Sequence, residues 1–492
     1  MIRDIYEEIK NGINVRQNLS SLRQELKEGS SRHAFLFNFA GECKDVLVPL
    51  LKNEDAKTRK NTALLLGELG QESFIEPLME AYRKEEQRFV RSSYLQALKQ
   101  FDYRSYLSEL KENLVELTEM ELTEENRKHV QEEKRVLTEL ILMMEGMKSH
   151  KFIGNHELSD IILLTNRDHI NITLEQLKPM KARPFNAGII AQTDDLNKVM
   201  AVRTFQEILF AVPGKRSCKM DAEHAAEALS SEKVMNFLKL RHNGDFPFYF
   251  RIELKCRMPL DKKSTFTKKV SAAIEEKTQR KLVNSTSHYE IEFRLIENKE
   301  GNLNILLKLY TLKDERFSYR KEVTAASIKP VNAALTVELT KKYMKEDAQV
   351  LDPFCGVGTM LIERHKAVKA NTMYGIDIFG EAVKKARVNT EAAHQIVHYI
   401  NRDFFDFKHQ YLFDEIITDM PFTTGRTSKE EIDELYHRFF MKVKNHLKTN
   451  GILILYSHNK GMVRRYGSQV FEILEQIEIN KKEETYVFVL KN

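Results

Sequence analysis

The chain of 492 residues is too long for one hydrophobic core, so we expect two to four domains. Hydrophobic residues make up 42% and charged residues 30%, and no apolar run approaches the roughly 20 residues that a membrane helix needs, which excludes an integral membrane protein. The net charge of +5 permits a nucleic-acid partner without demonstrating one, because the distribution of charge matters more than its total.

The first residues and the cysteines favour a cytoplasmic protein. Residues 1–8 are charged and lack the apolar core of a signal peptide. Four cysteines lie far apart in the sequence: Cys43, Cys218, Cys256 and Cys355. This spacing argues against a disulfide framework and against a thiolate zinc site. Three histidines of the C-terminal part show no metal-ligand spacing either: His365, His394 and His398. We therefore expect no metal.

Residues 1–146 are predicted to be helical, because apolar residues recur at helical spacing and Gly and Pro are sparse. Residues 46–69 and 74–101 share one pattern: a helix with an internal Pro, a charged turn, and a helix that opens with Arg59 or Arg91. The pattern resembles HEAT repeats, which are stacked helix pairs with a shared core. The resemblance implies a docking surface for a protein partner or RNA, but a helical cap that stabilises the rest of the chain explains the pattern equally well.

Residues 150–320 are predicted to form an α+β region, ferredoxin-like plus a second module. Strands are expected at 161–164, 187–190, 248–254, 289–295 and 302–308, and helices at 196–210 and 262–278. The later order of strand, basic helix, strand, strand resembles a THUMP domain, an RNA-binding module often placed before RNA methyltransferases. A generic α+β linker domain is the alternative.

The most informative stretch is Val350–Glu363, an apolar strand that runs into a glycine turn and a helix. Gly356 and Gly358 lack a Cβ, so a ligand can approach the backbone closely. In open parallel sheets, ligands lie beyond the carboxyl ends of the strands, at such turns. The next strand ends at Asp377, and a later strand ends in Asp-Met-Pro-Phe at residues 419–422.

These three motifs together resemble a class I S-adenosylmethionine (SAM) methyltransferase of the amino-group type. The resemblance implies a Rossmann-like α/β domain at 321–492 with a seven-stranded sheet. Seven apolar runs are available for it: 349–352, 373–377, 397–401, 415–419, 451–457, 472–479 and 484–490. Helical segments separate the first five runs, which predicts parallel strands with right-handed crossovers. A short charged turn joins the last two, which predicts a terminal hairpin.

The resemblance also assigns roles in binding SAM. The backbone at the two glycines would reach the methionine carboxylate, helped by the positive end of the following helix. Asp352 would meet the amino group of the same moiety, Asp377 would accept both ribose hydroxyls, and Asp403 the adenine amino group; a helix N-cap is the alternative for Asp403. The full predicted cofactor site is Asp352, Pro353, Phe354, Gly356, Gly358, Thr359, Asp377, Ile378, Asp403 and Phe404, with Phe404 lining the adenine pocket.

The predicted catalytic residues are Asp419, Met420, Pro421 and Phe422. An exocyclic amine is a poor nucleophile because its lone pair is delocalised into the ring. The Asp419 carboxylate and the Met420 carbonyl would orient it, Pro421 would fix the turn, and Phe422 would stack on the ring, so catalysis is mostly positioning and electrostatics. The family pattern is Asp/Asn-Pro-Pro-Tyr/Phe. Met420 departs from it, which leaves the substrate more open than the chemistry.

Resemblance to THUMP-containing RNA methyltransferases is greatest at residues 316–320 and 325–330. A paired base cannot reach such a site, so it must be flipped out or taken from a loop. The predicted phosphate contacts are Arg316, Arg320, Lys329, Arg426 and the helix lysines Lys262, Lys263, Lys268 and Lys269, each of which is equally explained as a solvated surface charge. The loop at residues 423–429 is predicted to close over the base.

The sequence therefore predicts a SAM-dependent RNA N-methyltransferase, with guanine N2 in tRNA as its target on the strength of the resemblance alone. Two alternatives stay open. One is a methyltransferase acting on rRNA guanine N2 or on adenine N6 of DNA or rRNA, which would orient its amine with the same Asp-x-Pro-Phe turn. The other is a non-catalytic RNA-binding scaffold with a vestigial SAM site.

Overall fold

The computed structural model describes residues 2–27, 29–39, 41–120, 123, 125–145, 150–422 and 428–492, without the side chains of 29–32 and 119. Contacts divide the chain into two compact units, Met1–Ser149 and His150–Asn492. Among the described residues, no helix has both the length and the apolar character that crossing a membrane requires.

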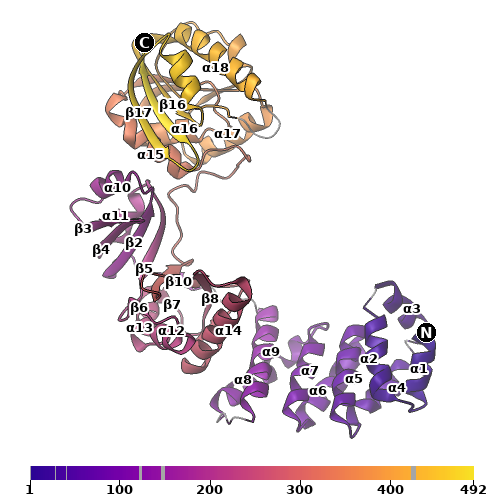
Figure 1. Ribbon diagram of the computed structural model, residues 1–492. Helices are drawn as coiled ribbons and strands as arrows, with labels where there is room; N and C mark the ends of the chain where they lie inside the picture. The colour runs from indigo at the N-terminus through magenta and orange to yellow at the C-terminus, as the bar shows by residue number, and fades with distance from the viewer. Residues whose placement is uncertain are drawn as a thin grey trace. The chain divides into compact units, whose positions relative to one another are not determined.

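The described part of the first unit is helical, as the sequence predicts (Figure 1). Its α-helices are α1 (Ile2–Lys10), α2 (Val15–Glu25), α3 (Gly29–Phe39), α4 (Cys43–Leu47), α5 (Ala56–Leu69), α6 (Ile75–Lys84), α7 (Arg88–Leu98), α8 (Leu107–Glu119) and α9 (Arg127–Glu145). Short 3-10 segments occur at Val48–Lys52, Glu72–Phe74 and Arg104–Tyr106. Helix α5 packs against α7 and α7 against α9. The approach of α5 to α7 needs Gly67, since an added Cβ would lie 2.7 Å from the Ala97 Cα.

The two arginines that open the repeated helices hold the helical stack together. Arg59 donates two hydrogen bonds of 2.8 Å to the Glu85 carboxylate, and Arg91 donates one of 2.6 Å to Glu133. Both carboxylates are buried, so each needs such a partner to offset the loss of water. These arginines therefore connect successive helix pairs.

The first part of the second unit mixes helices and strands. Its strands are β1 (Lys151–Phe152), β2 (Ser159–Thr165), β3 (Lys181–Phe185), β4 (Gly188–Thr193), β5 (Phe205–Ala211), β6 (Ser217–Cys218), β7 (His242–Asn243), β8 (Phe248–Lys255), β9 (Leu282–Asn284), β10 (Ile291–Glu297) and β11 (Leu303–Leu309). Its helices are α10 (Ile170–Gln176), α11 (Leu196–Ala201), α12 (Ala222–Leu229), α13 (Glu232–Arg241) and α14 (Leu260–Lys277). The main sheet has the strand order β3-β4-β2-β5-β11-β10-β8-β9, and α14 packs on β8 and β9 (Figure 1).

The predicted helix over residues 196–210 is wrong. Helix α11 ends at Ala201 and strand β5 begins at Phe205, because β5 pairs with β2 on one side and with β11 on the other. Phe205 and Phe210 are fully buried in this sheet. Short apolar stretches do not distinguish helix from strand, and the long-range pairing decides the outcome here.

The last part of the chain forms a twisted sheet with helices on both faces. Its strands are β12 (Ala348–Asp352), β13 (Ala370–Asp377), β14 (His398–Asn401), β15 (Phe413–Asp419), β16 (Leu447–Ser457), β17 (Glu472–Asn480) and β18 (Thr485–Lys491). Its helices are α15 (Pro330–Thr340), α16 (Thr359–Ala367), α17 (Gly380–Ala392), α18 (Lys429–Val443) and the short α19 (Lys460–Met462), with one-turn segments at Lys341–Tyr343, Phe404–Asp406 (η5), Lys444–His446 and Val463–Gly467.

In the described residues the strand order of this sheet is β14-β13-β12-β15-β16-β18-β17. Strands β12 to β16 are parallel, and β17 and β18 form the predicted terminal hairpin. Strand β13, which follows β12 along the chain, lies on one side of β12, and β16, which follows β15, lies on the other side. The direction of the connections therefore reverses between β12 and β15, and open α/β sheets bind their ligands at such a switch point.

Hydrogen bonds join the two parts of the second unit. Arg203 donates two hydrogen bonds, of 2.7 and 2.6 Å, to the Glu363 carboxylate on α16, and the Tyr319 hydroxyl donates a third of 2.6 Å. Asn166 also donates to the Ile479 carbonyl at the end of β17. Because residues 150–492 form one contact unit, the predicted domain boundary near residue 320 stays a prediction.

Candidate active site

Polar side chains gather where four neighbouring strands end. Asp352, Asp377, Asn401 and Asp419 are the last residues of β12, β13, β14 and β15. These strands are adjacent in the sheet and parallel, so their carboxyl ends meet at one edge. The structure therefore brings the glycine turn, the ribose-binding candidate and the Asp-x-Pro-Phe turn to the same edge, as the sequence predicts.

The glycine turn requires both glycines, but for different reasons. Gly356 and Gly358 have positive φ angles of 52° and 82°, which other residues adopt only with strain. A Cβ on Gly358 would overlap with the Tyr399 hydroxyl, which pairs with Thr390 at 2.7 Å. A Cβ on Gly356 would meet no atom within 4 Å. Gly358 thus allows tight packing within the protein, while Gly356 borders open space.

The N–H groups of both glycines donate within the protein, which gives no support to their predicted use for the methionine carboxylate. The Gly356 N–H donates to Asp377 Oδ2 at 2.9 Å, and the Gly358 N–H donates to the Cys355 carbonyl at 2.8 Å. The first amides of α16, from Thr359 onward, have no partner within their helix and remain available to an anion. The Thr359 Oγ1 atom is also buried without a hydrogen-bond partner.

Asp352 stabilises the turn instead of facing a ligand. It is 1% exposed, and its Oδ1 accepts hydrogen bonds from the Phe354 N–H at 3.1 Å and from the Thr418 hydroxyl at 2.5 Å. Burial raises the pKa of Asp352 to about 7. Because Thr418 directly precedes Asp419, this pair holds the glycine turn beside the Asp-x-Pro-Phe turn. The predicted contact of Asp352 with the SAM amino group has no support from this geometry.

A buried ion pair between α16 and β15 also connects the glycine turn to the Asp-x-Pro-Phe turn. Arg364 on α16 is fully buried and donates hydrogen bonds of 2.9 and 2.8 Å to the two oxygens of Glu415 on β15. Arg364 also donates to the Lys345 carbonyl at 2.8 Å. The helix that begins at the glycine turn is thereby fixed to the strand that ends at Asp419.

Asp377 ends β13, and its neighbours present an apolar surface; its role toward the ribose hydroxyls stays a prediction. Its two oxygens accept the N–H groups of Gly356 and Phe379, which fixes the carboxylate and leaves further lone pairs for hydroxyl groups. Burial raises the pKa of Asp377. Ile378 and Phe379 are 60% and 72% exposed, unusual for large apolar residues, and a flat adenine ring would cover such a surface. The Asn401 amide holds this segment by donating to the Asp377 and Ile378 carbonyls.

The structure shows the N-cap alternative for Asp403, whose Oδ1 accepts the Phe405 N–H at 2.9 Å at the start of η5. Phe404 is 2% exposed and packs against Phe354 and Phe439 in the core. The ring is enclosed by Phe354, Phe439 and His446, so this structure gives no support to the prediction that Phe404 lines the adenine pocket. Pro353, which precedes Phe354, is buried at the start of the glycine turn.

Asp419 has the electrostatic properties of a reactive group. Its Oδ1 is buried and has no hydrogen-bond partner. Burial, with a smaller contribution from the charge of Asp352, raises the pKa of Asp419 to about 8. Met420 is 1% exposed and its N–H donates to the Tyr456 carbonyl at 2.8 Å, which anchors the turn to β16. A buried acceptor without a donor is costly, which indicates that this oxygen accepts a hydrogen bond from a bound ligand.

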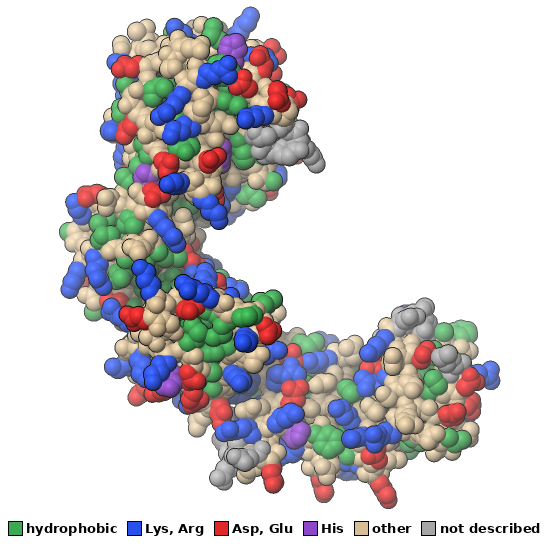
Figure 2. All heavy atoms as spheres, viewed as in Figure 1, with side chains coloured by type: hydrophobic (Ala, Val, Ile, Leu, Met, Phe, Trp, Pro, Cys, Tyr) green, Lys and Arg blue, Asp and Glu red, His purple; other side chains and the backbone are tan. Residues whose placement is uncertain are grey.

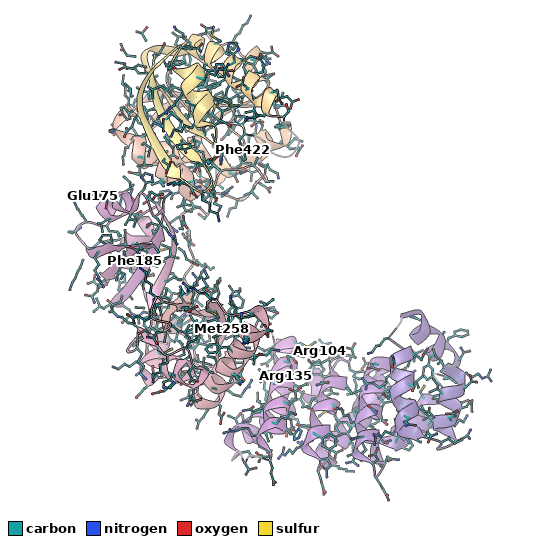
Figure 3. The ribbon with its side chains drawn as sticks, in the orientation of Figure 1. Arg104, Arg135, Glu175, Phe185, Met258 and Phe422 are labelled. Atoms are coloured by element: carbon teal, nitrogen blue, oxygen red, sulfur yellow. The ribbon has the colours of Figure 1, made fainter. Side chains whose placement is uncertain are left out.

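Phe422 (labelled in Figure 3) follows the half-buried Pro421 and packs on a histidine that the sequence analysis missed. The Phe422 and His458 rings lie 4.2 Å apart between centroids, at 36°. The Nδ1 atom of His458 lies 3.2 Å from the Glu483 carbonyl, so the histidine is held in turn by the terminal hairpin. His458 therefore supports one face of the ring that is predicted to stack on the substrate.

The predicted RNA-binding residues have different outcomes. The prediction that Arg316 contacts RNA is wrong. Its side chain pairs with Asp314 at 2.6 Å and donates to the Val202 and Phe205 carbonyls, and the residue is only 6% exposed. Arg320 is half-buried, and its Nε has no partner. Lys262, Lys268, Lys269 and Lys329 are exposed and Lys263 is half-buried, and all five stay predictions. Arg426 and most of the predicted closing loop, residues 423–427, lie outside the described residues.

Four residues of this edge were not predicted as site residues: Thr418, Tyr399, Asn401 and His458. Thr418 and Asn401 end or nearly end apolar strands, as the predicted aspartates do, so their position was a usable signal. Tyr399 and His458 act through packing on residues far away in the sequence, and no local pattern indicates that.

The residues present fit a bound SAM molecule. The edge offers open space at Gly356, free helix amides for a carboxylate, Asp377 for hydroxyl groups and exposed apolar residues for a flat ring. Within the described ranges, no three His, Cys, Asp or Glu side chains form a group that could hold a metal. The sheet order and this site define a class I methyltransferase domain, and its cofactor is SAM.

Comparison with known proteins agrees with this class. The family model described as "RMKL-like, methyltransferase domain" matches residues 318–485, and the family model for HEAT repeats matches residues 35–114. The first match covers the glycine turn, Asp377 and the Asp-x-Pro-Phe turn. The second covers both predicted repeats in the first unit.

Individual proteins resemble parts of the chain. The ribosomal protein L11 methyltransferase of Dictyoglomus turgidum is 26% identical over 163 residues, 32% of this chain and 49% of the relative. The tRNA (guanine(10)-N2)-dimethyltransferase of Pyrococcus abyssi is 33% identical over 131 residues, 25% of this chain and 38% of the relative. The chain thus spans half or less of the length of these relatives. The crystal structure of TrmN from Thermus thermophilus matches with a TM-score of 0.52 and 17% identity, over 68% of this chain and 100% of that chain.

Proposed function

We propose that this protein is a SAM-dependent RNA N-methyltransferase that methylates an exocyclic base amine, guanine N2 in tRNA. The observation that carries the proposal is the unpaired, buried Oδ1 of Asp419 beside the glycine turn. An acceptor at that position matches an amine donor. Asp419 is tied to the turn through Thr418 and Asp352, so both partners of the reaction would meet at one edge.

Bound SAM would supply an electrophilic methyl group, and S-adenosylhomocysteine would leave as the bond between sulfur and the methyl carbon breaks. Asp419 accepts one amine hydrogen in a hydrogen bond, the Met420 carbonyl accepts the second, and Phe422 holds the ring flat on its His458 support. The amine gains the methyl group and loses one proton, which the ionised Asp419 accepts or passes to water. The orientation of the amine supplies most of the rate, since a well-oriented reaction avoids much of the entropic cost of association.

Several features support RNA as the substrate. One relative is a tRNA (guanine(10)-N2)-dimethyltransferase, which matches a quarter of this chain. The first part of the second unit carries the basic helix α14 beside its sheet, in the order that resembles a THUMP domain. A cytoplasmic location follows from the same proposal. The helical unit, residues 1–146, is proposed as a docking surface for a protein partner or the RNA.

The curated relative that acts on ribosomal protein L11 favours a second candidate, in which the amine belongs to a protein. That relative is matched over a longer stretch, 163 residues, but at lower identity. An Asp at the first position of the Asp-Met-Pro-Phe turn leans toward a nucleobase amine, which is why we favour RNA. Methylation of adenine N6 in rRNA or DNA would use the same geometry, and the experiment below distinguishes this alternative from guanine N2.

The test is transfer of tritiated methyl groups from SAM to total tRNA, rRNA, DNA and ribosomal protein, followed by nucleoside analysis of the labelled fraction. We expect N2-methylguanosine from tRNA. Label in N6-methyladenosine or in protein would replace the proposed substrate by one of the alternatives.

Asp419→Ala separates an enzyme from a scaffold. We expect this variant to lose turnover by at least about 100-fold, as loss of a group that stabilises the transition state does, while SAM affinity by isothermal titration stays within about 2-fold. Absence of SAM binding by the unaltered protein would favour the non-catalytic scaffold. Loss of turnover and SAM binding together would mean that Asp419 has a structural role.

A further inference from the structure

A basic cavity lies in the second unit, outside the site described above. Its volume is about 490 Å³, and it is lined by Leu254, Lys255, Cys256, Arg257, Lys263, Glu297, Asn298 and Lys299. Four of these side chains are cationic and one is a carboxylate. Figure 2 shows Lys and Arg side chains beside apolar ones on the visible face of this region, and Met258, which follows Arg257, is labelled in Figure 3.

The topology places this cavity where parallel strands bind ligands. Strands β8 and β10 are adjacent and parallel, with Lys255 opposite Ile296, and α14 forms the connection that leaves β8. The cavity lies at the carboxyl ends of both strands and at the first turn of α14, which begins at Leu260 and has 18 residues. Carboxyl ends of parallel strands and the positive end of a long helix are the usual surroundings of a phosphate group.

The cations of the cavity are not neutralised by the protein. Lys255 pairs with Glu253 at 3.2 Å, but Arg257, Lys263 and Lys299 make no ion pair within the described residues. The carboxylate of Glu297 accepts the backbone N–H of Arg257 at 2.8 Å, not its guanidinium. Asp261 in the first turn of α14 and Glu300 in the β10–β11 turn are the other acids nearby, and both are exposed. Three free cations around one hollow hold a net positive charge that an anion would offset.

We propose that this cavity binds backbone phosphate groups of the RNA substrate, with Arg257, Lys263 and Lys299 as the contacting residues. The proposal rests on the proposed RNA methyltransferase function. The Arg257 guanidinium can donate two parallel hydrogen bonds to one phosphate group, whereas each lysine acts as a point charge. Such contacts position the RNA without reading its sequence. Lys263 is one of the α14 lysines that the sequence predicted to contact RNA, whereas Arg257 and Lys299 were not predicted, and all three line the same cavity.

The test compares two double variants of the full-length protein that remove the same charge. Arg257→Gln/Lys263→Gln alters the cavity, and Lys151→Gln/Lys239→Gln alters two exposed lysines of the same unit that line no part of it. Binding of end-labelled total tRNA is measured without SAM at 50 to 200 mM salt. We expect the cavity variant to bind tRNA about 10-fold more weakly at 0.1 M salt. The plot of the logarithm of the association constant against the logarithm of salt concentration should be less steep by about 1.5, because each phosphate contact releases counterions. The control variant should stay within about 2-fold.

A charge-conserving variant, Arg257→Lys/Lys263→Arg, should recover most of the affinity. The proposal is overturned if the cavity variant binds tRNA as tightly as the unaltered protein, or if both double variants lose affinity equally. Unchanged tRNA binding with loss of binding to poly-glutamate would assign the cavity to an acidic peptide instead, which also overturns it. Methyl transfer by the unaltered protein is measured separately, so failure of the proposed function and failure of this inference give different results.

Discussion

The proton on Asp419 should control the rate. Burial raises its pKa to about 8, so below that pH the carboxyl is neutral and has one fewer acceptor for the amine. We expect kcat/KM for tRNA to rise about 10-fold per pH unit up to pH 8 and to level off above pH 9, because kcat/KM reports groups of the free enzyme. Rates measured across pH 6 to 10 test this. Asp419→Asn, which cannot ionise, should be slower and independent of pH over this range; a pH-dependent Asn variant would assign the titration to another group.

The same shift predicts a change in stability with pH. A carboxyl whose folded pKa exceeds its unfolded value of about 4 adds stability below pH 4, and this contribution is lost as the pH rises through the folded value. The unaltered protein should therefore lose stability relative to Asp419→Asn between pH 4 and 8. Thermal unfolding at pH 6 and pH 9 should show a larger advantage for the Asn variant at pH 9; an equal difference at both would contradict a raised pKa.

His458 should act by supporting Phe422. The two rings pack at 4.2 Å, and such aromatic pairs contribute about 0.5–1.5 kcal/mol, so His458→Ala should lower kcat/KM for RNA about 3- to 10-fold. SAM affinity should not change, because His458 lies on the side of the Asp-x-Pro-Phe turn. His458→Phe keeps a flat ring and should restore the rate. Equal defects in the Ala and Phe variants would assign the role to the imidazole nitrogens instead.

At the scale of the elements, the glycine turn predicts two different glycine phenotypes. Gly358→Ala places a methyl group against the Tyr399 hydroxyl and should destabilise the fold by about 2 kcal/mol or more. Gly356→Ala meets no atom within 4 Å, so it should cost only about 1 kcal/mol of backbone strain while weakening SAM binding about 10-fold. Denaturant unfolding and isothermal titration measure both quantities. Equal loss of stability in the two variants would show that Gly356 does not border open space.

At the scale of the molecule, Arg203 connects the first part of the second unit to the methyltransferase sheet. It supplies two of the three donors to the Glu363 carboxylate, whose side chain is 1% exposed. Breaking a buried pair leaves an uncompensated charge and costs about 3–5 kcal/mol. Arg203→Met should lower stability by about 3 kcal/mol in denaturant unfolding, and Arg203→Met/Glu363→Met should recover part of it.

A matched change at an exposed pair provides the control for Arg203. Lys198 pairs with Asp195 at 3.4 Å and is 74% exposed, so Lys198→Met should cost less than about 1 kcal/mol. Similar losses for Arg203→Met and Lys198→Met would mean that Glu363 finds other partners or water. In that case the contact is not what joins the two parts.

The elements of the methyltransferase sheet could be predicted because parallel strands are buried on both faces and read as apolar runs. The same reasoning failed at residues 196–210, where β5 depends on β2 and β11 for its pairing. The RNA-binding prediction at Arg316 failed because charge alone does not reveal burial. That guanidinium is enclosed by Asp314 and two carbonyls from the strand region near residue 205.

The sequence by itself determined the order of the strands along the chain, the glycine turn and the acids that end β13 and β15, since local periodicity and glycine geometry encode them. Only the tertiary structure decided which side chains face a ligand. Asp352 and Asp403 look like binding residues in the sequence, yet one oxygen of each accepts a hydrogen bond within the protein, from Thr418 and from the Phe405 N–H. Whether an oxygen is free depends on its neighbours in space, and those neighbours lie on distant segments whose position the chain acquires only when it folds.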